Sequence, residues 1–194
     1  MKFALKQILM KIEIISGSPR GNSVTNRIAL HLKKQIEQKT DHEIDIIDVR
    51  ENELPLLQSI FTSAQSAPEP FQELTERMLN ANAFILLTPE YNGSYSAALK
   101  NLLDHFPKQH HKVFAIATAS PGMLGGIRAA MQLQELVYAL FGIGSPNMLV
   151  TPQVDKKFDA EGNLLDESFK KSGDLFVNEF IWLAEKIVDE KVSA

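Results

Sequence analysis

The feature that most constrains the fold is a regular alternation of short apolar runs with longer segments of helical periodicity. Five runs rich in β-branched and apolar residues have the length of strands: 10–16, 43–49, 83–88, 112–120 and 146–154. Five longer segments place their apolar residues on one helical face: 23–39, 68–80, 94–106, 125–142 and 166–190. This alternation predicts an α/β fold, a doubly wound sheet of parallel strands joined by right-handed crossovers.

The apolar runs also predict where helices cover the sheet. Three of the five read as continuous apolar stretches, which is typical of strands buried on both faces. In segment 23–39, apolar residues recur every fourth position and Ser23 is the expected helix cap. We therefore expect helices on both faces of the sheet.

Composition excludes several classes of function. The chain of 194 residues has a formal net charge of −4 and no basic run, which argues against a nucleic-acid partner. It contains no cysteine, so disulfides, thiolate nucleophiles and zinc–sulfur sites are excluded. No apolar run approaches the roughly 18 residues of a membrane span. Residues 1–9 are interpreted as a short extension rather than a signal peptide, because Lys6 interrupts their apolar character. We expect one cytoplasmic domain over 1–194.

Three loops are the candidate ligand-binding segments. In an open parallel sheet, ligands bind at the carboxyl ends of the strands, near the point where the strand order reverses. The loops after the first, third and fourth strands are 16–23 (SGSPRGNS), 89–95 (PEYNGSY) and 119–126 (ASPGMLGG).

The first loop suits a phosphate group. It opens a helix, whose first turn presents unpaired N–H groups and a partial positive charge. Hydroxyl groups and one guanidinium add donors, supplied by Ser16, Ser18, Arg20, Ser23 and Thr25. The loop lacks the Gly-Lys-Ser/Thr ending of a P-loop and the three glycines of the dinucleotide fingerprint. We favour a phosphate monoester bound without metal over a plain helix-capping turn.

The other two loops allow two interpretations each. Residues Pro89–Gly93 combine an aromatic ring, an amide and flexible backbone, which suits a flat polar ligand such as a flavin ring. The same composition suits a well-formed turn with Tyr91 in the core. In 119–126, glycines permit close approach of a ligand and Ser120 offers a hydrogen bond, but a loose helix cap needs the same residues.

Taken together, the three stretches resemble one family. GSPRGNS, PEYNGSYSAALKNLLDH and SPGMLGGIRAAMQL follow the first, third and fourth strands in this order. Between about Met10 and Val154 the chain is similar to the NAD(P)H-dependent FMN reductases, a flavodoxin-like group that includes quinone, chromate and azo-dye reductases. The middle stretch is the most specific of the three.

The resemblance implies a five-stranded parallel sheet in the order 2-1-3-4-5 that holds FMN non-covalently. By motif match, Ser18, Arg20 and Ser23 hold the phosphate, with Thr25 at a position where relatives commonly carry Asn. The motif also implies residues around the isoalloxazine ring, namely Pro89, Glu90, Tyr91, Asn92, Gly93, Ser120 and Gly122. A second departure is Ser96, which stands where relatives often carry proline.

The function implied is that of an NAD(P)H-dependent oxidoreductase. Hydride passes from nicotinamide to bound FMN, and electrons then pass to a quinone, azo compound or similar small acceptor, in ping-pong order. Catalytic chemistry resides in the cofactor. The family often forms homodimers or dimer-of-dimers tetramers. Two alternatives are a flavodoxin-type one-electron carrier for protein partners and a non-enzymatic module with an empty site.

Several further residues receive structural interpretations. Glu90 is expected to be a turn residue or structural partner rather than a general base. Arg128 either reaches the mouth of the site or is an ordinary surface arginine. His105, His110 and His111 cluster at a helix end, where we expect solvated surface rather than a metal site.

Overall fold

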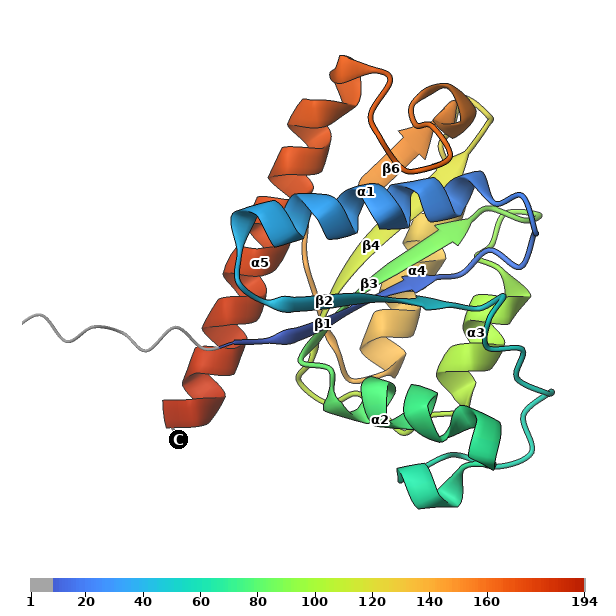
Figure 1. Ribbon diagram of the computed structural model, residues 1–194, viewed down its shortest axis with the longest axis vertical. Helices are drawn as coiled ribbons and strands as arrows, with labels where there is room; N and C mark the ends of the chain where they lie inside the picture. The colour runs from blue at the N-terminus through green and yellow to red at the C-terminus, as the bar shows by residue number, and fades with distance from the viewer. Residues whose placement is uncertain (1–8, 194) are drawn as a thin grey trace, which may run out of the picture.

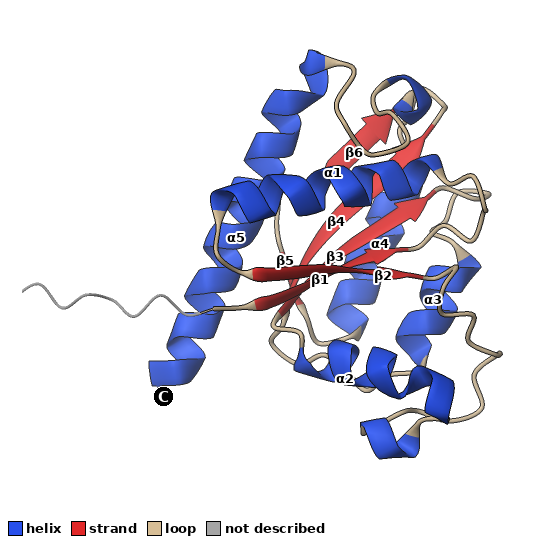
Figure 2. Cartoon of the chain, in the orientation of Figure 1, coloured by secondary structure: helices blue, strands red, loops and turns tan. Residues whose placement is uncertain are grey.

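The structure is a computed structural model that describes residues 9–193. A parallel sheet forms its centre. The strand order is β2-β1-β3-β4-β5, and β6 also pairs with β4. The strands are β1 (Lys11–Ser16), β2 (Glu43–Asp48), β3 (Ala83–Pro89), β4 (Val113–Ser120), β5 (Ile143–Gly144) and β6 (Leu149–Pro152). All their pairings are parallel, as the arrows in Figure 2 show. The predicted α/β fold and strand order are confirmed.

Helices cover both faces of this sheet (Figure 1). One apolar cluster joins the sheet to α1 (Val24–Lys39) and α5 (Lys170–Ser193). A second cluster joins the opposite face to α2 (Gln72–Asn80), α3 (Ala97–Asp104) and α4 (Ile127–Ala139). Four short 3₁₀ turns lie at Ala64–Ser66, Glu69–Phe71, Val154–Lys156 and Glu167–Phe169. Burial on both faces accounts for the continuous apolar runs in the sequence.

The fifth predicted strand, 146–154, differs from the structure. Its place beside β4 is filled by two shorter strands, β5 and β6. Val113 pairs with Ile143 and Ala117 with Leu149, so the chain between β5 and β6 holds two residues more than the matching part of β4. The extra residues leave the ladder around Pro146, which has no N–H group to donate.

Four helices begin later than the periodicity predicted. In segments 68–80 and 166–190 a 3₁₀ turn comes first, so α2 begins at Gln72 and α5 at Lys170. Segment 94–106 becomes helical only at Ala97, because Tyr91 and Ser94 close a tight turn ahead of it. Segment 125–142 becomes helical only at Ile127, because Gly125 and Gly126 have positive φ values of 60° and 90°. Apolar spacing alone carries no information on these backbone conformations.

The prediction for the histidine cluster is partly wrong. His110 and His111 are exposed, but His105 is only 1 % exposed. Its Nδ1 lies 2.7 Å from the carbonyl oxygen of Asn101, and its ring lies against that of Phe61, with 5.1 Å between the centroids. The long segment that follows β2 covers this side chain, which the sequence around the helix could not indicate.

Strand β2 forms one edge of the sheet. The N–H groups of Glu43 and Val49 donate to the carbonyls of Met10 and Ser16, at the two ends of β1. Because N–H groups alternate in direction along a strand, those of the even-numbered residues of β2 point away from β1. The outward N–H group of Ile46 donates to Oδ1 of Asp45 at 2.9 Å, and Nζ of Lys33 donates to the same oxygen at 3.0 Å.

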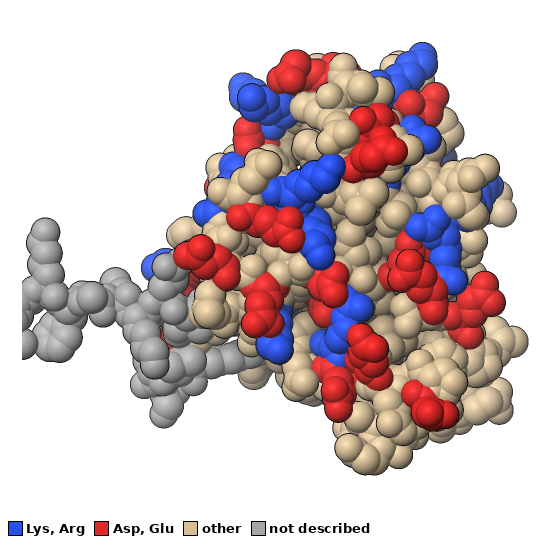
Figure 3. All heavy atoms as spheres, in the orientation of Figure 1, with Lys and Arg blue, Asp and Glu red and all other residues tan. Residues whose placement is uncertain are grey.

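The face of the molecule shown in Figure 3 carries mixed charge. Basic and acidic side chains are interspersed there rather than gathered into a patch of one sign. Among residues 9–193, no helix combines the length and the apolar character needed to cross a bilayer. Residues 1–8, most of the predicted extension, lie outside the described residues; Leu9 is 61 % exposed, and Met10 is the first residue in the core.

Candidate functional site

The first loop leaves β1 at Ser16 and is fixed to the sheet by its backbone. The N–H group of Gly17 donates to the carbonyl of Leu87 at 2.8 Å. A methyl group added to Gly17 would lie 2.9 Å from Cβ of Leu99, so this position requires glycine. At the other end of the loop, Ser23 caps α1 as predicted, because its Oγ accepts the N–H of Asn26 at 3.2 Å.

The first turn of α1 is suited to an anion. It carries no acidic residue, so nothing in it opposes the positive end of the helix dipole. Of the four predicted phosphate contacts, Ser18 and Thr25 are each 2 % exposed, Ser23 is half-buried and Arg20 is exposed. They therefore lie at different depths around the start of one helix.

Arg20 reaches from the first loop to the second. Its Cζ lies 4.8 Å from the centroid of the Tyr91 ring, a cation–π distance. The ring of Tyr91 thus has one guanidinium neighbour, and its hydroxyl oxygen is buried without a hydrogen-bond partner. This contact joins a predicted phosphate residue to a predicted ring residue.

The second loop contains a two-residue hairpin. Tyr91 and Ser94 exchange backbone hydrogen bonds of 2.9 and 3.1 Å. Between them, Asn92 and Gly93 have φ values of 51° and 80°, the left-handed pair that a type I′ turn requires. The Asn-Gly pair in the sequence explains this turn, which holds exposed Asn92 at the carboxyl edge beyond Pro89, the last residue of β3.

Ser96 is a buried link that the sequence reasoning missed. Its Oγ donates to the carbonyl of Gly17 and accepts the N–H of Leu99 at 3.0 Å, which caps α3. Its own N–H donates to Oγ1 of Thr88 at 3.0 Å. The proline common in relatives could make none of the side-chain bonds. A serine directly before a helical run is a capping signal that could have found it.

Glu90 holds the second loop against α4. Its Oε2 accepts the N–H groups of Arg128 and Ala129 at 3.0 and 3.4 Å, and its Oε1 lies 3.6 Å from Nη1 of Arg128. A carboxylate at a helix N-terminus is stabilised by the helix dipole. The expectation that Glu90 is a structural partner is confirmed, and Arg128, 66 % exposed in its side chain, faces the same loop.

The third loop starts beside the second, because Pro89 and Ala119 are register partners in β3 and β4. Oγ of Ser120 accepts the N–H of Gly122 at 3.0 Å and keeps its own hydrogen for a further acceptor. A methyl group on Gly126 would lie 2.9 Å from Cβ of Thr118, whose hydroxyl donates to the Gly125 carbonyl. The strand and the start of α4 are therefore in close contact.

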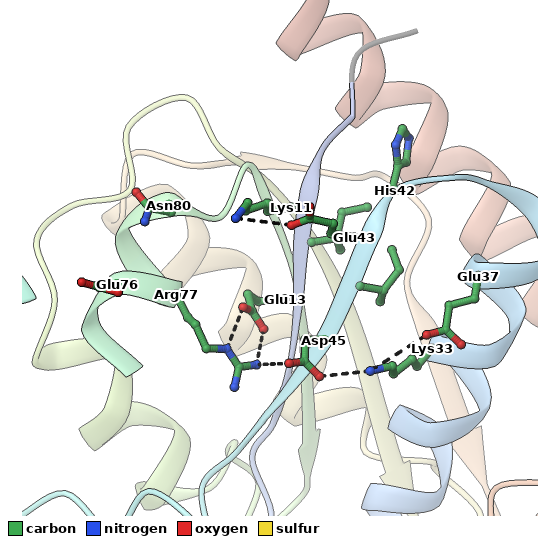
Figure 4. Close-up of a pocket in the computed structure, with 12 residues that line it drawn as sticks. Lys11, Glu13, Lys33, Glu37, His42, Glu43, Asp45, Glu76, Arg77 and Asn80 are labelled. Atoms are coloured by element: carbon green, nitrogen blue, oxygen red, sulfur yellow. Dashed lines mark hydrogen bonds and ion pairs between the residues drawn. The ribbon is translucent and has the colours of Figure 1, made fainter. Parts of the chain in front are cut away.

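A surface hollow lies at the opposite end of the strands from these three loops. It has a volume of about 550 Å³ and lies along the amino ends of β1 and β2. Figure 4 shows Arg77 of α2 directed towards Glu13 of β1 and Asp45 of β2, with Lys33 of α1 beyond Asp45. These charges neutralise one another. The amino ends of parallel strands are not where such sheets bind ligands. Among the described residues, no group of His, Asp or Glu side chains is placed to hold a metal ion.

The carboxyl edge has the chemistry that FMN requires. Arg20 and the first turn of α1 supply charge and donors for a phosphate, and the left-handed Asn92–Gly93 turn exposes backbone polar groups beside an aromatic ring. Buried hydroxyls without partners lie at the ends of the same strands, on Ser16 and Tyr91. These residues fit a ligand with an anionic tail and a flat polar ring.

Comparison with known proteins agrees with this chemistry. Residues 10–154 match the family described as NADPH-dependent FMN reductase. The FMN-dependent NADPH-azoreductase of Staphylococcus aureus is 34 % identical over 179 residues, covering 89 % of this chain and 94 % of the relative.

Solved structures share the fold. The flavoenzyme NAD(P)H:(acceptor) oxidoreductase FerB of Paracoccus denitrificans has a TM-score of 0.74 at 23 % identity, over 92 % of this chain and 98 % of that one. A mutant form of a flavodoxin of Pseudomonas aeruginosa has a TM-score of 0.57 at 18 % identity, over 88 % of this chain and 99 % of that one. The family and the curated relative favour a reductase over a flavodoxin-type carrier. The chain belongs to the NADPH-dependent FMN reductase family and is an oxidoreductase that uses FMN with NAD(P)H.

Proposed function

We propose that the carboxyl edge of the sheet holds FMN and that the protein reduces small aromatic acceptors, such as quinones or azo compounds. One observation carries the proposal: the positive start of α1, the Asn92–Gly93 turn and the Ser120 loop leave neighbouring strands at one edge. Bound FMN supplies the transfer of hydride and electrons. The protein binds and orients.

The phosphate is assigned to the start of α1. Ser18, Arg20, Ser23 and Thr25 surround it, and the guanidinium of Arg20 supplies the only full positive charge among them. Arg20 also contacts Tyr91, so it can fix the relative position of the two loops while it neutralises the anion. In this role it orients the ligand as well as attracting it.

The ring is assigned to the second and third loops. Its neighbours in this proposal are Pro89, Glu90, Tyr91, Asn92, Gly93, Ser120 and Gly122. Because the carboxylate of Glu90 is engaged by α4, Glu90 contributes through its backbone. Backbone groups of Asn92 and Gly93 are the candidates to stabilise negative charge on the ring.

The assignment of the phosphate is tested by Arg20→Ala. Loss of a charged hydrogen bond weakens FMN binding by about 1–3 kcal/mol. The measurement is quenching of flavin fluorescence on titration of the apoprotein, with riboflavin as the ligand that lacks the phosphate. Lys39→Ala, which removes an exposed cation from the last turn of α1 rather than the first, is the control and should bind FMN as the parent does. An unchanged FMN affinity in Arg20→Ala would contradict the assignment.

The acceptor and the nucleotide are tested by steady-state kinetics. The assay follows oxidation of NADPH and of NADH with a panel of quinones, azo dyes and free FMN. The S. aureus relative is named for NADPH and azo compounds, which supports azo dyes as the first acceptors to try. Parallel-line ping-pong kinetics with one of these acceptors supports the proposal; bound flavin that NADPH and NADH fail to bleach under anaerobic conditions would favour an electron carrier.

Assembly and location are part of the same proposal. We infer a homodimer, or a tetramer built from two dimers, for which exposed apolar side chains on and after α4 offer surface: Met131, Tyr138 and Phe141 are 52 %, 73 % and 56 % exposed. Sedimentation of the holoprotein tests this. We also propose a single cytoplasmic domain, supported by one sheet with two covered faces and by the lack of cysteine.

A further inference from the structure

An arginine outside the three loops is bound to the first of them. Arg50 follows β2, and its Nε lies 2.9 and 3.0 Å from the two carboxylate oxygens of Asp48. Its Nη2 donates to the same carboxylate, which is buried at the end of the strand. Its remaining nitrogen, Nη1, donates to the carbonyl of Gly21 at 2.9 Å. The guanidinium therefore links β2 to the predicted phosphate loop.

The carboxylate that holds Arg50 is itself fixed. Asp48 Oδ1 also accepts the backbone N–H of Arg50 at 2.9 Å, and the carbonyl of Asp48 accepts Nδ2 of Asn52 at 3.0 Å. The hydrogen bond to Asp48 raises the pKa of Arg50 above its usual value. The guanidinium of Arg50 and the carboxylate of Asp48, both rigid and planar, thus meet side by side. This pairing fixes the direction in which Nη1 of Arg50 donates to the carbonyl of Gly21.

The contact controls which way one peptide group points. In a trans peptide the carbonyl of Gly21 and the N–H of Asn22 point in opposite directions. Gly21 has open space where a side chain would be, so nothing on the residue itself prevents rotation of this peptide. Rotation would exchange the positions of an oxygen and an N–H within a loop that has to accept an anion.

We propose that Arg50, held by Asp48, is a positioning residue that keeps the Gly21 carbonyl out of the anion site and so preorganises the loop for the FMN phosphate. Its charge is compensated by Asp48, so its effect comes from geometry rather than from attraction of the phosphate. This inference rests on the proposed function, since it assumes that the phosphate lies at the start of α1.

The chain offers a matched control pair. Nε and Nη2 of Arg77 donate to the two oxygens of Glu13 at 2.9 and 2.6 Å (Figure 4). The arginine side chains of both pairs are 26 % exposed, and those of Asp48 and Glu13 are 5 % and 8 % exposed. The Arg77 pair lies at the amino ends of the strands. Lysine at position 77 therefore reports the general cost of losing such a pair.

The experiment compares FMN and riboflavin binding by the apoproteins of Arg50→Lys, Arg50→Gln and Arg77→Lys. Lysine keeps the charge but cannot make the three directed contacts. We expect both Arg50 variants to raise the Kd for FMN about tenfold, the cost of one charge-assisted bond, and to leave the Kd for riboflavin within about twofold. Arg77→Lys should change neither. FMN binding by Arg50→Lys equal to that of the parent would overturn the inference.

Asp48→Asn provides a second test, for which a charge effect and a geometric effect predict opposite changes in FMN affinity. It applies even if the Arg50 variants do not fold. Removal of the negative charge next to the loop should strengthen FMN binding if Arg50 acts through its charge. If Arg50 acts through geometry, the released guanidinium leaves Gly21 less fixed and the Kd for FMN rises several-fold. Tighter binding overturns the inference. Failure of the parent and of Arg20→Ala to differ in FMN affinity would instead reject the phosphate assignment itself.

Discussion

The buried hydroxyl of Ser96 allows a quantitative test of how the site is held together. Ser96→Ala removes the cap of α3, leaving the N–H group of Leu99 without its acceptor, and it removes the hydrogen bond to the carbonyl of Gly17. A lost cap costs about 1 kcal/mol and a lost buried hydrogen bond about 1–1.5 kcal/mol. Because Ser96 is fully buried, water cannot replace either partner. The free energy of unfolding should fall by about 2–3 kcal/mol.

The assay is urea unfolding of the apoprotein, followed by circular dichroism, with thermal melting as a second measure. The corresponding fall in Tm is roughly 4–12 °C for a chain of this size. Ser63→Ala is the matched control: Ser63 also caps a helical turn, accepting the N–H of Ser66 at 3.2 Å, but in a solvent-exposed contact. It should lose at most about 1 kcal/mol. A loss in Ser96→Ala no larger than that in Ser63→Ala would refute the reasoning.

Three further predictions concern stability. Gly126→Ala should cost at least about 1 kcal/mol, because φ is 90° and the added methyl would lie 2.9 Å from Cβ of Thr118; a melting temperature equal to the parent's would contradict this. Glu90→Gln should cost about 0.3–1 kcal/mol, the value of a charge at a helix N-terminus, and Glu90→Ala more; urea unfolding of Glu90→Gln identical to that of the parent would show that the charge is irrelevant. The hydrogen bond from Lys157 lowers the pKa of Asp166 from 3.8 to about 2, so its stabilisation is complete above about pH 4 and is lost as the pH falls towards 2. Asp166→Asn should therefore melt below the parent at pH 6, and this gap should become much smaller at pH 2; a gap of the same size at both pH values would exclude this cause.

The fold was largely predictable because the sheet is buried on both faces. That burial requires continuous apolar runs in the strands and one apolar face on each helix, and both patterns are visible in the sequence. The Asn92–Gly93 turn and the Ser23 cap were accessible for a similar reason, since each depends on residues next to one another in the chain.

The remaining features depend on contacts between distant residues. The division of the predicted fifth strand into β5 and β6 arises because the chain there has two residues more than the matching part of β4. No local sequence pattern indicates such a difference in length. Glu90 reaches α4 across 38 positions, and Arg50 reaches Gly21 across 29. The part of the site that holds the loops in place was therefore hidden, whereas the residues assigned to the ligand were readable as a motif and stay a prediction.

The contact between Asp45 and Ile46 at the edge strand has a consequence for solubility. An additional strand from a second molecule would need the outward N–H groups of β2 as donors, and one of these is already occupied by a side chain of its own strand. Fibrous aggregation by strand addition at this edge would have to displace a carboxylate that Lys33 also holds. An alanine at position 45 would expose that donor and remove the charge, so concentrated preparations of such a variant should precipitate sooner than the parent.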